Sequence, residues 1–64
     1  MFLKKRANAI KKAMLYKHTN QKKIAQHLGI SESYVTRLIN GERYYREFEI
    51  FIRYELGVSY TNFR

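Results

Sequence analysis

Apolar side chains recur every three or four positions along this chain, and this spacing restricts its fold more than any other feature. It is the spacing of one face of an α-helix, whereas a half-buried strand requires alternation. The chain has no proline, and its three glycines stand at the ends of the periodic segments. The sequence therefore predicts an all-α fold of helices joined by short turns.

We expect a compact four- to five-helix bundle. The four main helices are expected over residues 2–17, 21–28, 32–40 and 46–56. The end of the first helix, the end of the third and the start of the fourth are approximate. Asn20 and Ser31 can each accept a backbone N–H bond at the start of the second and third helices. The glycines can take the positive φ that ends a helix. Ser59 is placed to cap a fifth short turn that holds Tyr60 and Phe63.

The same spacing predicts which side chains are buried. The expected core consists of Leu3, Ala7, Ile10, Met14, Ile24, Ala25, Leu28, Val35, Leu38, Ile39, Phe48, Phe51, Ile52 and Leu56. A chain of about 60 residues buries only about 60% of the surface that it exposes when unfolded. Residues 1–64 are therefore expected to form one domain with one small core.

The residue types present exclude several function classes. The chain has no cysteine, and His18 and His27 lack a nearby carboxylate partner, so we expect neither a disulfide nor a metal site. It has no glycine-rich phosphate loop and no nucleophile paired with a base, so we expect no enzyme, cofactor or small-molecule ligand. The longest apolar run, Ala13 to Tyr16, is far too short to span a bilayer, and no secretory signal follows Met1. We expect an intracellular, cytoplasmic location.

Positive charge is concentrated in the first half of the chain. The sequence has 13 Lys and Arg against five Asp and Glu, a formal net charge of +8. All five acidic residues lie beyond residue 31, so residues 1–31 carry only positive charge and residues 32–64 sum to zero. A field of one sign attracts polyanions, which favours nucleic acid or an anionic membrane surface as partner.

The first helix is predicted to carry a basic face. Its members fall within an arc of about 120° away from the apolar stripe, and they are Lys4, Lys5, Asn8, Lys11 and Lys12. Such a helix can lie on an anionic bilayer. Its apolar stripe lacks the Trp, Phe and Leu bulk of interfacial helices, however, so nucleic acid is the preferred partner.

The second and third helices have the pattern of a helix-turn-helix unit over residues 21–40. Both are short, and three residues beginning with Gly29 separate them. Ala25 is small enough for the helices to cross closely, and Gly29 can take the positive φ of a tight turn. The wedge between the helices is expected to be filled by Ile24, Leu28, Ile30, Val35 and Leu38.

A resemblance to the phage Cro and repressor type of helix-turn-helix domain, also called the XRE family, lies in residues 20–43, NQKKIAQHLGISESYVTRLINGER. Leu56-Gly57-Val58-Ser59 is similar to the link between the fourth and fifth helices of that family. The resemblance covers residues 20 to about 60. It implies a five-helix domain that binds operator DNA, commonly as a symmetric dimer, in transcriptional regulation.

The resemblance also implies which residues touch DNA. The expected base contacts are Glu32, Ser33, Thr36 and Arg37, and the expected phosphate contacts are Gln21, Ser31, Tyr34, Asn40 and Arg43. Lys22 departs from the more neutral or acidic residue common in the family, and its charge adds it to the phosphate contacts. Arg37 is the strongest candidate, because its guanidinium fork matches guanine O6 and N7. For Glu32 a second role stays open, that of a favourable acid in the first turn of its helix.

The aromatic residues after residue 43 have two interpretations. Tyr44 and Tyr45 either bond phosphate or pack over the core, and packing is preferred. Ile50, Tyr54, Tyr60 and Phe63 are hard to bury in so small a protein and form a candidate homodimer surface. A two-fold dimer would place two recognition helices about 34 Å apart on a palindromic operator.

Several biological roles fit such a domain. The preferred one is a Cro-like repressor of a phage or mobile element. The alternatives are an excisionase-like recombination directionality factor, a protein-binding adaptor or antirepressor, and an antitoxin or restriction-control protein. RNA is a poorer partner, because the major groove of an A-form helix excludes a reading helix. The sequence leaves open the operator and whether transcription falls or rises.

Overall fold

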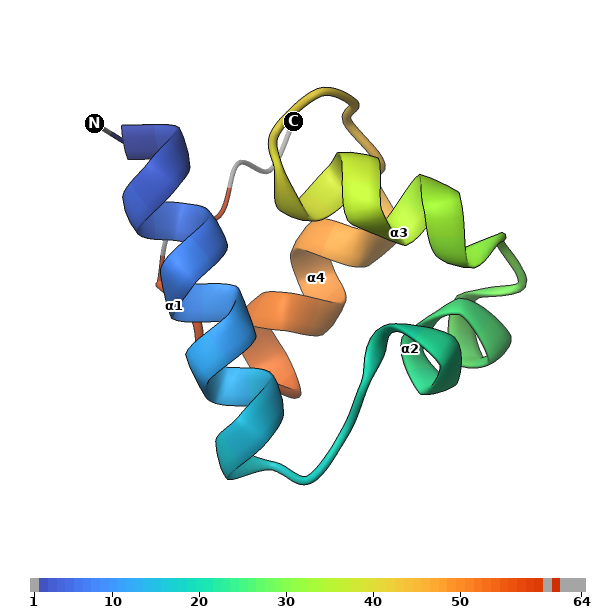
Figure 1. The fold of residues 1–64 in the computed structure, drawn as a ribbon, viewed down its shortest axis with the longest axis horizontal. Coiled ribbons are helices and arrows are strands. Elements are labelled where there is room, and N and C mark those ends of the chain that lie inside the picture. The colour runs from blue at the N-terminus through green and yellow to red at the C-terminus, as the bar shows by residue number, and fades with distance from the viewer. Residues whose placement is uncertain (1, 60, 62–64) are drawn as a thin grey trace.

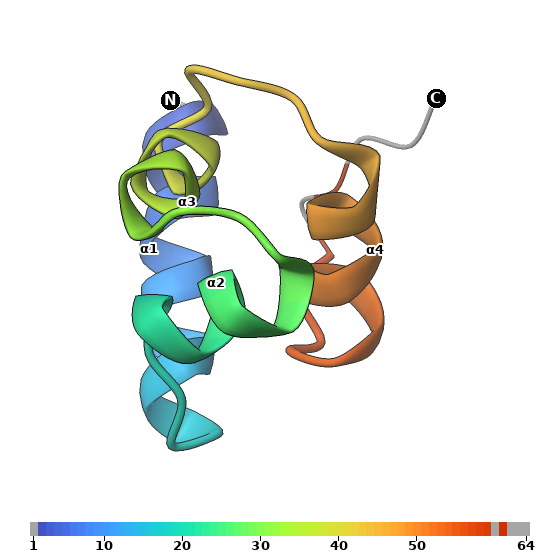
Figure 2. The same cartoon turned by 90° about the vertical axis from the view of Figure 1, so that its right-hand side faces the viewer.

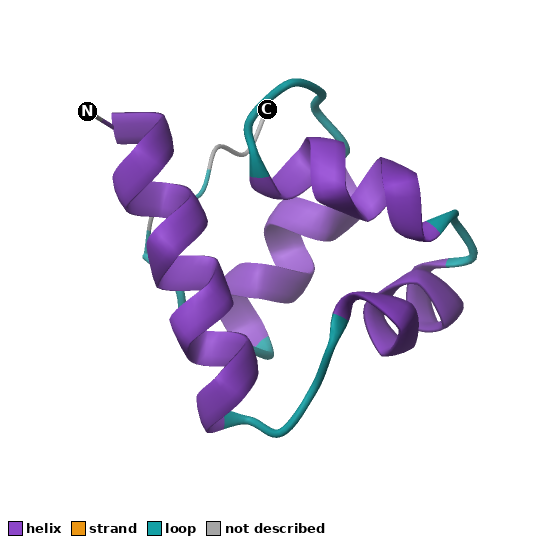
Figure 3. Ribbon diagram, viewed as in Figure 1, coloured by secondary structure: helices purple, strands orange, loops and turns teal. Residues whose placement is uncertain are grey.

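The computed structural model describes residues 2–59 and 61, with side chains from residue 4 onward. Within this part of the chain there are four α-helices and no strand: α1 (Phe2–Tyr16), α2 (Gln21–Leu28), α3 (Glu32–Ile39) and α4 (Arg46–Tyr54) (Figure 1, Figure 3). The predicted all-helical fold is confirmed. The fifth turn expected at Tyr60 and Phe63 falls on residues outside the described part.

α2 and α3 begin at the two side chains predicted to cap them. Asn20 Oδ1 accepts a hydrogen bond of 2.9 Å from the backbone N–H of Lys23. Ser31 Oγ accepts one of 3.1 Å from the backbone N–H of Tyr34. Each bond satisfies an N–H group that has no acceptor within its own helix, which fixes where the helix starts.

α2 and α3 each end at a glycine with positive φ, as predicted from the positions of the glycines in the sequence. Gly29 has a φ of 70°, and the next N–H, of Ile30, bonds the carbonyl oxygen of Ala25 at 3.0 Å. Gly41, with a φ of 78°, ends α3 with a similar bond. These bonds satisfy carbonyl groups that the helix end leaves free. The turn between α2 and α3 is therefore three residues long, as expected.

α1 ends in the same geometry without a glycine. His18 has a φ of 56° and is the one residue other than glycine with positive φ in the described part of the chain. The N–H of Thr19 then bonds the carbonyl oxygen of Met14 at 2.9 Å. A side chain in this conformation is disfavoured by about 1 kcal/mol or more relative to glycine. α1 therefore ends at a position where the backbone is strained.

The core lies between α4 and the other three helices. α3 contacts both α1 and α2. Figure 2 shows α1 and α3 on one side of the molecule and α4 on the other. The buried apolar side chains between them are Ala7, Ile10, Met14, Ile24, Ala25, Val35, Leu38, Ile39, Phe48, Ile52, Leu56 and Val58.

The core differs from the prediction in three places. Leu28 and Phe51 are half-buried, because each lies at the edge of the core. α4 was predicted to end at Leu56, but it ends at Tyr54. Gly57, with a φ of 73°, turns the chain after this helix, so that Leu56 and the unexpected core residue Val58 both pack inward.

Arg6 does not contribute to the exposed positive charge of residues 1–31, because it is buried. It is one of the positive charges counted in residues 1–31, but it is 4% exposed and pairs with Glu49, which is 2% exposed. Arg6 Nη1 and Nη2 donate to the two carboxylate oxygens at 2.6 Å each, and Nη2 lies 3.5 Å from the carbonyl oxygen of Leu38. Such a two-pronged bond has a defined geometry, so the pair joins α1, the end of α3 and α4.

Candidate nucleic-acid interface

α3 has one buried and one exposed face. Val35, Leu38 and Ile39 are at most 1% exposed. The four predicted base contacts lie on the other side of the same helix and are all exposed: Glu32, Ser33, Thr36 and Arg37. With Asn40 they span an arc of about 140° at 100° per residue. The helix is therefore fixed by apolar packing on one side and presents polar groups on the other.

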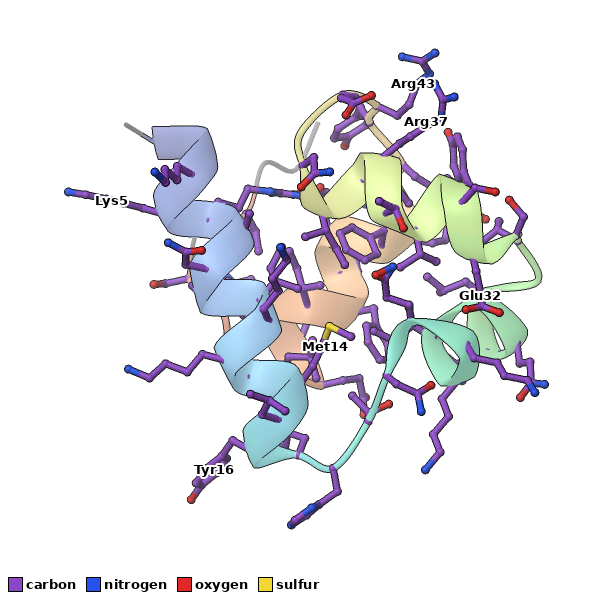
Figure 4. All side chains as sticks on the ribbon, in the orientation of Figure 1. Lys5, Met14, Tyr16, Glu32, Arg37 and Arg43 are labelled. Carbon is purple, nitrogen blue, oxygen red and sulfur yellow. The ribbon has the colours of Figure 1, made fainter. Side chains whose placement is uncertain are left out.

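Two arginines extend this exposed face beyond the end of α3. Arg37 and Arg43 are exposed, and in Figure 4 both side chains extend away from the body of the molecule at the same end. Arg43 Nη1 donates a hydrogen bond of 2.8 Å to the carbonyl oxygen of Glu42. These guanidinium groups are donors in a fixed planar fork, which suits guanine edges and phosphate oxygens.

A short hydrogen-bond chain joins the start of α2 to the exposed face of α3. Gln21 Nε2 donates to Thr36 Oγ1 at 2.7 Å. Thr36 Oγ1 in turn donates to the carbonyl oxygen of Glu32 at 3.2 Å. From the sequence, Gln21 was expected to contact phosphate and Thr36 a base, and a bond between the two was not predicted. It depends on how the two helices cross, which residue spacing alone does not specify.

The remaining predicted phosphate contacts lie along the edges of this face. Lys22, Ser31 and Asn40 are exposed and Gln21 is half-buried. Tyr34 is half-buried, and its ring packs edge-on against the ring of Tyr45 at a centroid distance of 6.2 Å. Its phenol group is thus carried on a ring that belongs partly to the core.

The two tyrosines after Arg43 are used differently. Tyr45 is half-buried and packs against the core, as preferred in the sequence analysis. Tyr44 is 38% exposed and does not belong to the buried cluster. Only one of the two therefore bears out the preferred interpretation.

The lysines of the first half remain exposed once Arg6 is set aside. They are Lys4, Lys5, Lys11, Lys12, Lys17, Lys22 and Lys23. In Figure 4 Lys5 points away from α2 and α3. Lys11 instead lines, with Lys22 and Glu32, a hollow of about 630 Å³ bounded by α1, the start of α2 and α3. No sequence signal indicated that Lys11 and Lys22 line one hollow.

The candidate dimer surface is partly described. Tyr54 is 71% exposed and Ile50 is half-buried. Both line a groove of about 220 Å³ between α2 and α4, with Leu28, Phe51, His27, Glu47 and Glu55. The other two members predicted for this surface, Tyr60 and Phe63, lie outside the described residues.

Two structural findings concern other classes of function. None of the helices in the described part of the chain is both long and apolar enough to cross a membrane. No group of three or more His, Asp or Glu side chains that would hold a metal ion occurs among the described residues.

Comparison with protein-family models, with curated proteins and with solved structures gave no match.

Proposed function

We propose that this protein is a sequence-specific, double-stranded-DNA-binding transcriptional regulator of the Cro-like type, with α2 and α3 as its helix-turn-helix unit. The observation that carries the proposal is the two-faced character of α3. Its apolar side is packed into the core, and its other side exposes Ser33, Thr36 and Arg37. A helix supported in this way can enter the major groove, where its first residues reach base edges.

The charge distribution supports a polyanionic partner. Seven lysines of residues 1–31 are exposed, and Arg37 and Arg43 extend from α3 and the segment after it. Each cation that neutralises a phosphate releases counterions, so binding is favoured and becomes salt-dependent. Arg6 contributes nothing to this term, because Glu49 already neutralises it.

In the proposed complex, residues at the edges of α3 hold the phosphates and residues on its face read bases. Arg37 donates to guanine O6 and N7, and Ser33 bonds a neighbouring base edge. Glu32 accepts from cytosine N4 or serves only as an acid at the start of α3. The phosphate contacts are Gln21, Lys22, Ser31, Tyr34, Asn40 and Arg43.

The protein is proposed to act as a homodimer on a palindromic operator. The α4 side supports this, because Tyr54 is 71% exposed and lines, with Ile50, the groove next to α2. Exposed apolar surface of this kind often marks an interface. Sedimentation with and without operator tests the dimer, and a monomer in both samples at high micromolar protein would exclude it.

The proposed function is tested by selection of bound duplexes from a randomised pool at about 150 mM salt, which suppresses purely electrostatic binding. Enrichment of a palindromic motif with half-sites about one helical turn apart supports a dimeric operator reader. An Arg37→Ala variant is selected in parallel, with Lys5→Ala as its control, because Lys5 points away from α3.

Other results would favour the alternatives. Asymmetric or directly repeated sites that the protein bends would favour a recombination directionality factor. A pool that is not enriched, despite tight binding at low salt, would contradict sequence-specific reading and favour an adaptor that binds protein.

A further inference from the structure

The hydroxyl group of Thr36 already has two partners inside the protein. It lies 3.2 Å from the carbonyl oxygen of Glu32 and 2.7 Å from Nε2 of Gln21. A carbonyl oxygen only accepts hydrogen bonds, so the hydroxyl hydrogen points to Glu32. An amide nitrogen only donates, so one oxygen lone pair points to Gln21. The hydroxyl can make both bonds at once, and Thr36 then has no hydrogen left to donate.

What Thr36 offers to a ligand is therefore mainly its methyl group. The residue is exposed on α3, on the same face as Ser33, Arg37 and Asn40. Each of those three neighbours has side-chain donors for base acceptors. In the major groove the apolar feature available to a threonine methyl is the C5-methyl group of thymine.

We propose that Thr36 recognises thymine by contact between its side-chain methyl and the C5-methyl of the base. This inference rests on the proposed DNA-reading function and names one base of the operator half-site. The bonds to Glu32 and Gln21 favour an apolar contact, because they engage the hydroxyl hydrogen and one of the two oxygen lone pairs. A threonine with a free hydroxyl would bond several bases and discriminate among them poorly.

Replacement of thymine by deoxyuridine tests the proposal, because it removes only the C5-methyl group. Each thymine of the selected operator is replaced in turn, symmetrically in both half-sites, and the affinity is measured at about 150 mM salt. For the natural protein we expect one position at which the change weakens binding about fourfold per half-site, or about 15-fold for the palindrome, the value of one buried methyl group.

Two variants connect that position with Thr36. Thr36→Ser keeps the hydroxyl and both of its bonds but lacks the methyl, so its affinity should be the same for the thymine and deoxyuridine duplexes. Thr36→Val keeps a methyl and lacks the hydroxyl, so it should keep the preference for thymine. Each variant is compared with itself on the two duplexes, so a general loss of affinity cancels. Lys5→Ala is the control, because Lys5 points away from α3, and it should keep the full preference for thymine.

Three results would overturn the proposal: no sensitive thymine in the half-site, a Thr36→Ser variant as sensitive to deoxyuridine as the natural protein, or a Thr36→Val variant without the preference for thymine. Each of these leaves sequence-specific binding intact, so the proposed function would stand. A randomised pool without any enrichment would instead overturn the proposed function, and this inference with it.

Discussion

The starts of α2 and α3 and the junction between α1 and α4 are fixed by interactions of very different range. The caps that start α2 and α3 join groups three residues apart, whereas Arg6 and Glu49 are 43 residues apart. Local groups repeat recognisable patterns, and a long-range pair forms only when the helices are already in place. The two arginines Arg6 and Arg37 also differ, since Arg6 is buried and Arg37 is exposed.

Breaking the junction should have the largest effect on stability. Arg6→Ala or Glu49→Ala leaves one charge buried without its partner, which should lower the free energy of unfolding by about 3–5 kcal/mol. For so small a domain this is a large share of the total. Urea denaturation followed by circular dichroism measures the change.

The matched control replaces both charges together. Arg6→Met combined with Glu49→Leu removes the ion pair and leaves apolar side chains, which should recover most of the lost stability. If the single variants lose less than about 1 kcal/mol, the pair does not hold the junction in solution.

Removal of the exposed Arg37 side chain should change DNA recognition and leave stability almost unchanged. Arg37→Ala should leave the free energy of unfolding within about 0.5 kcal/mol of the natural protein, because the side chain is exposed. It should reduce discrimination at one base pair by about 1–3 kcal/mol. Binding to the selected operator and to a duplex changed at that guanine measures this difference. Equal loss of affinity for both duplexes would assign Arg37 to phosphate contact.

The helices themselves were predictable because their boundaries are encoded locally. Asn20 and Ser31 cap α2 and α3, and Gly29 and Gly41 end them, as the residue types indicated. The Arg6–Glu49 pair was missed, although a weak signal exists. Arg6 lies about 40° from Ile10 on the helical wheel, and Glu49 about 60° from Ile52, so both adjoin apolar faces. That placement does not say which acid meets which base.

For the candidate site, the sequence indicated which face of α3 is exposed but not how the neighbouring side chains are arranged. The pattern indicated the exposed face of α3, and all four predicted base contacts are exposed there. The bond between Gln21 and Thr36, and the shared hollow that Lys11 and Lys22 line, follow from helix crossing. Crossing depends on the packing of whole side-chain surfaces, which spacing along one helix does not reveal.

Loss of the side-chain cap that starts α3 should have a smaller effect on stability than loss of the Arg6–Glu49 pair. Ser31→Ala removes the acceptor for the Tyr34 N–H and should lower the free energy of unfolding by about 1 kcal/mol. Ser33→Ala, an exposed serine inside the same helix, is the control and should change stability by less than about 0.5 kcal/mol. Equal effects of the two substitutions on the urea midpoint would contradict the capping role.

The strained end of α1 should give the smallest effect, and in the stabilising direction. His18→Gly relieves a positive φ at a residue with a side chain, although it adds freedom to the unfolded chain. We expect a net gain of about 0.5 kcal/mol, seen as a small rise in Tm. Lys17→Gly, next in the chain but without positive φ, should lower the Tm. A fall in Tm for His18→Gly as well would contradict the assigned strain.

Whether the exposed face of α3 reads DNA is measured by ¹H–¹⁵N spectra of the labelled protein during titration with the selected operator at about 150 mM salt. If α3 reads DNA, the shifts should be confined mainly to the start of α2, to residues 31–40 and to Arg43. Shifts centred instead on the side of α1 that carries Lys5, with α3 unchanged, would contradict DNA reading by α3.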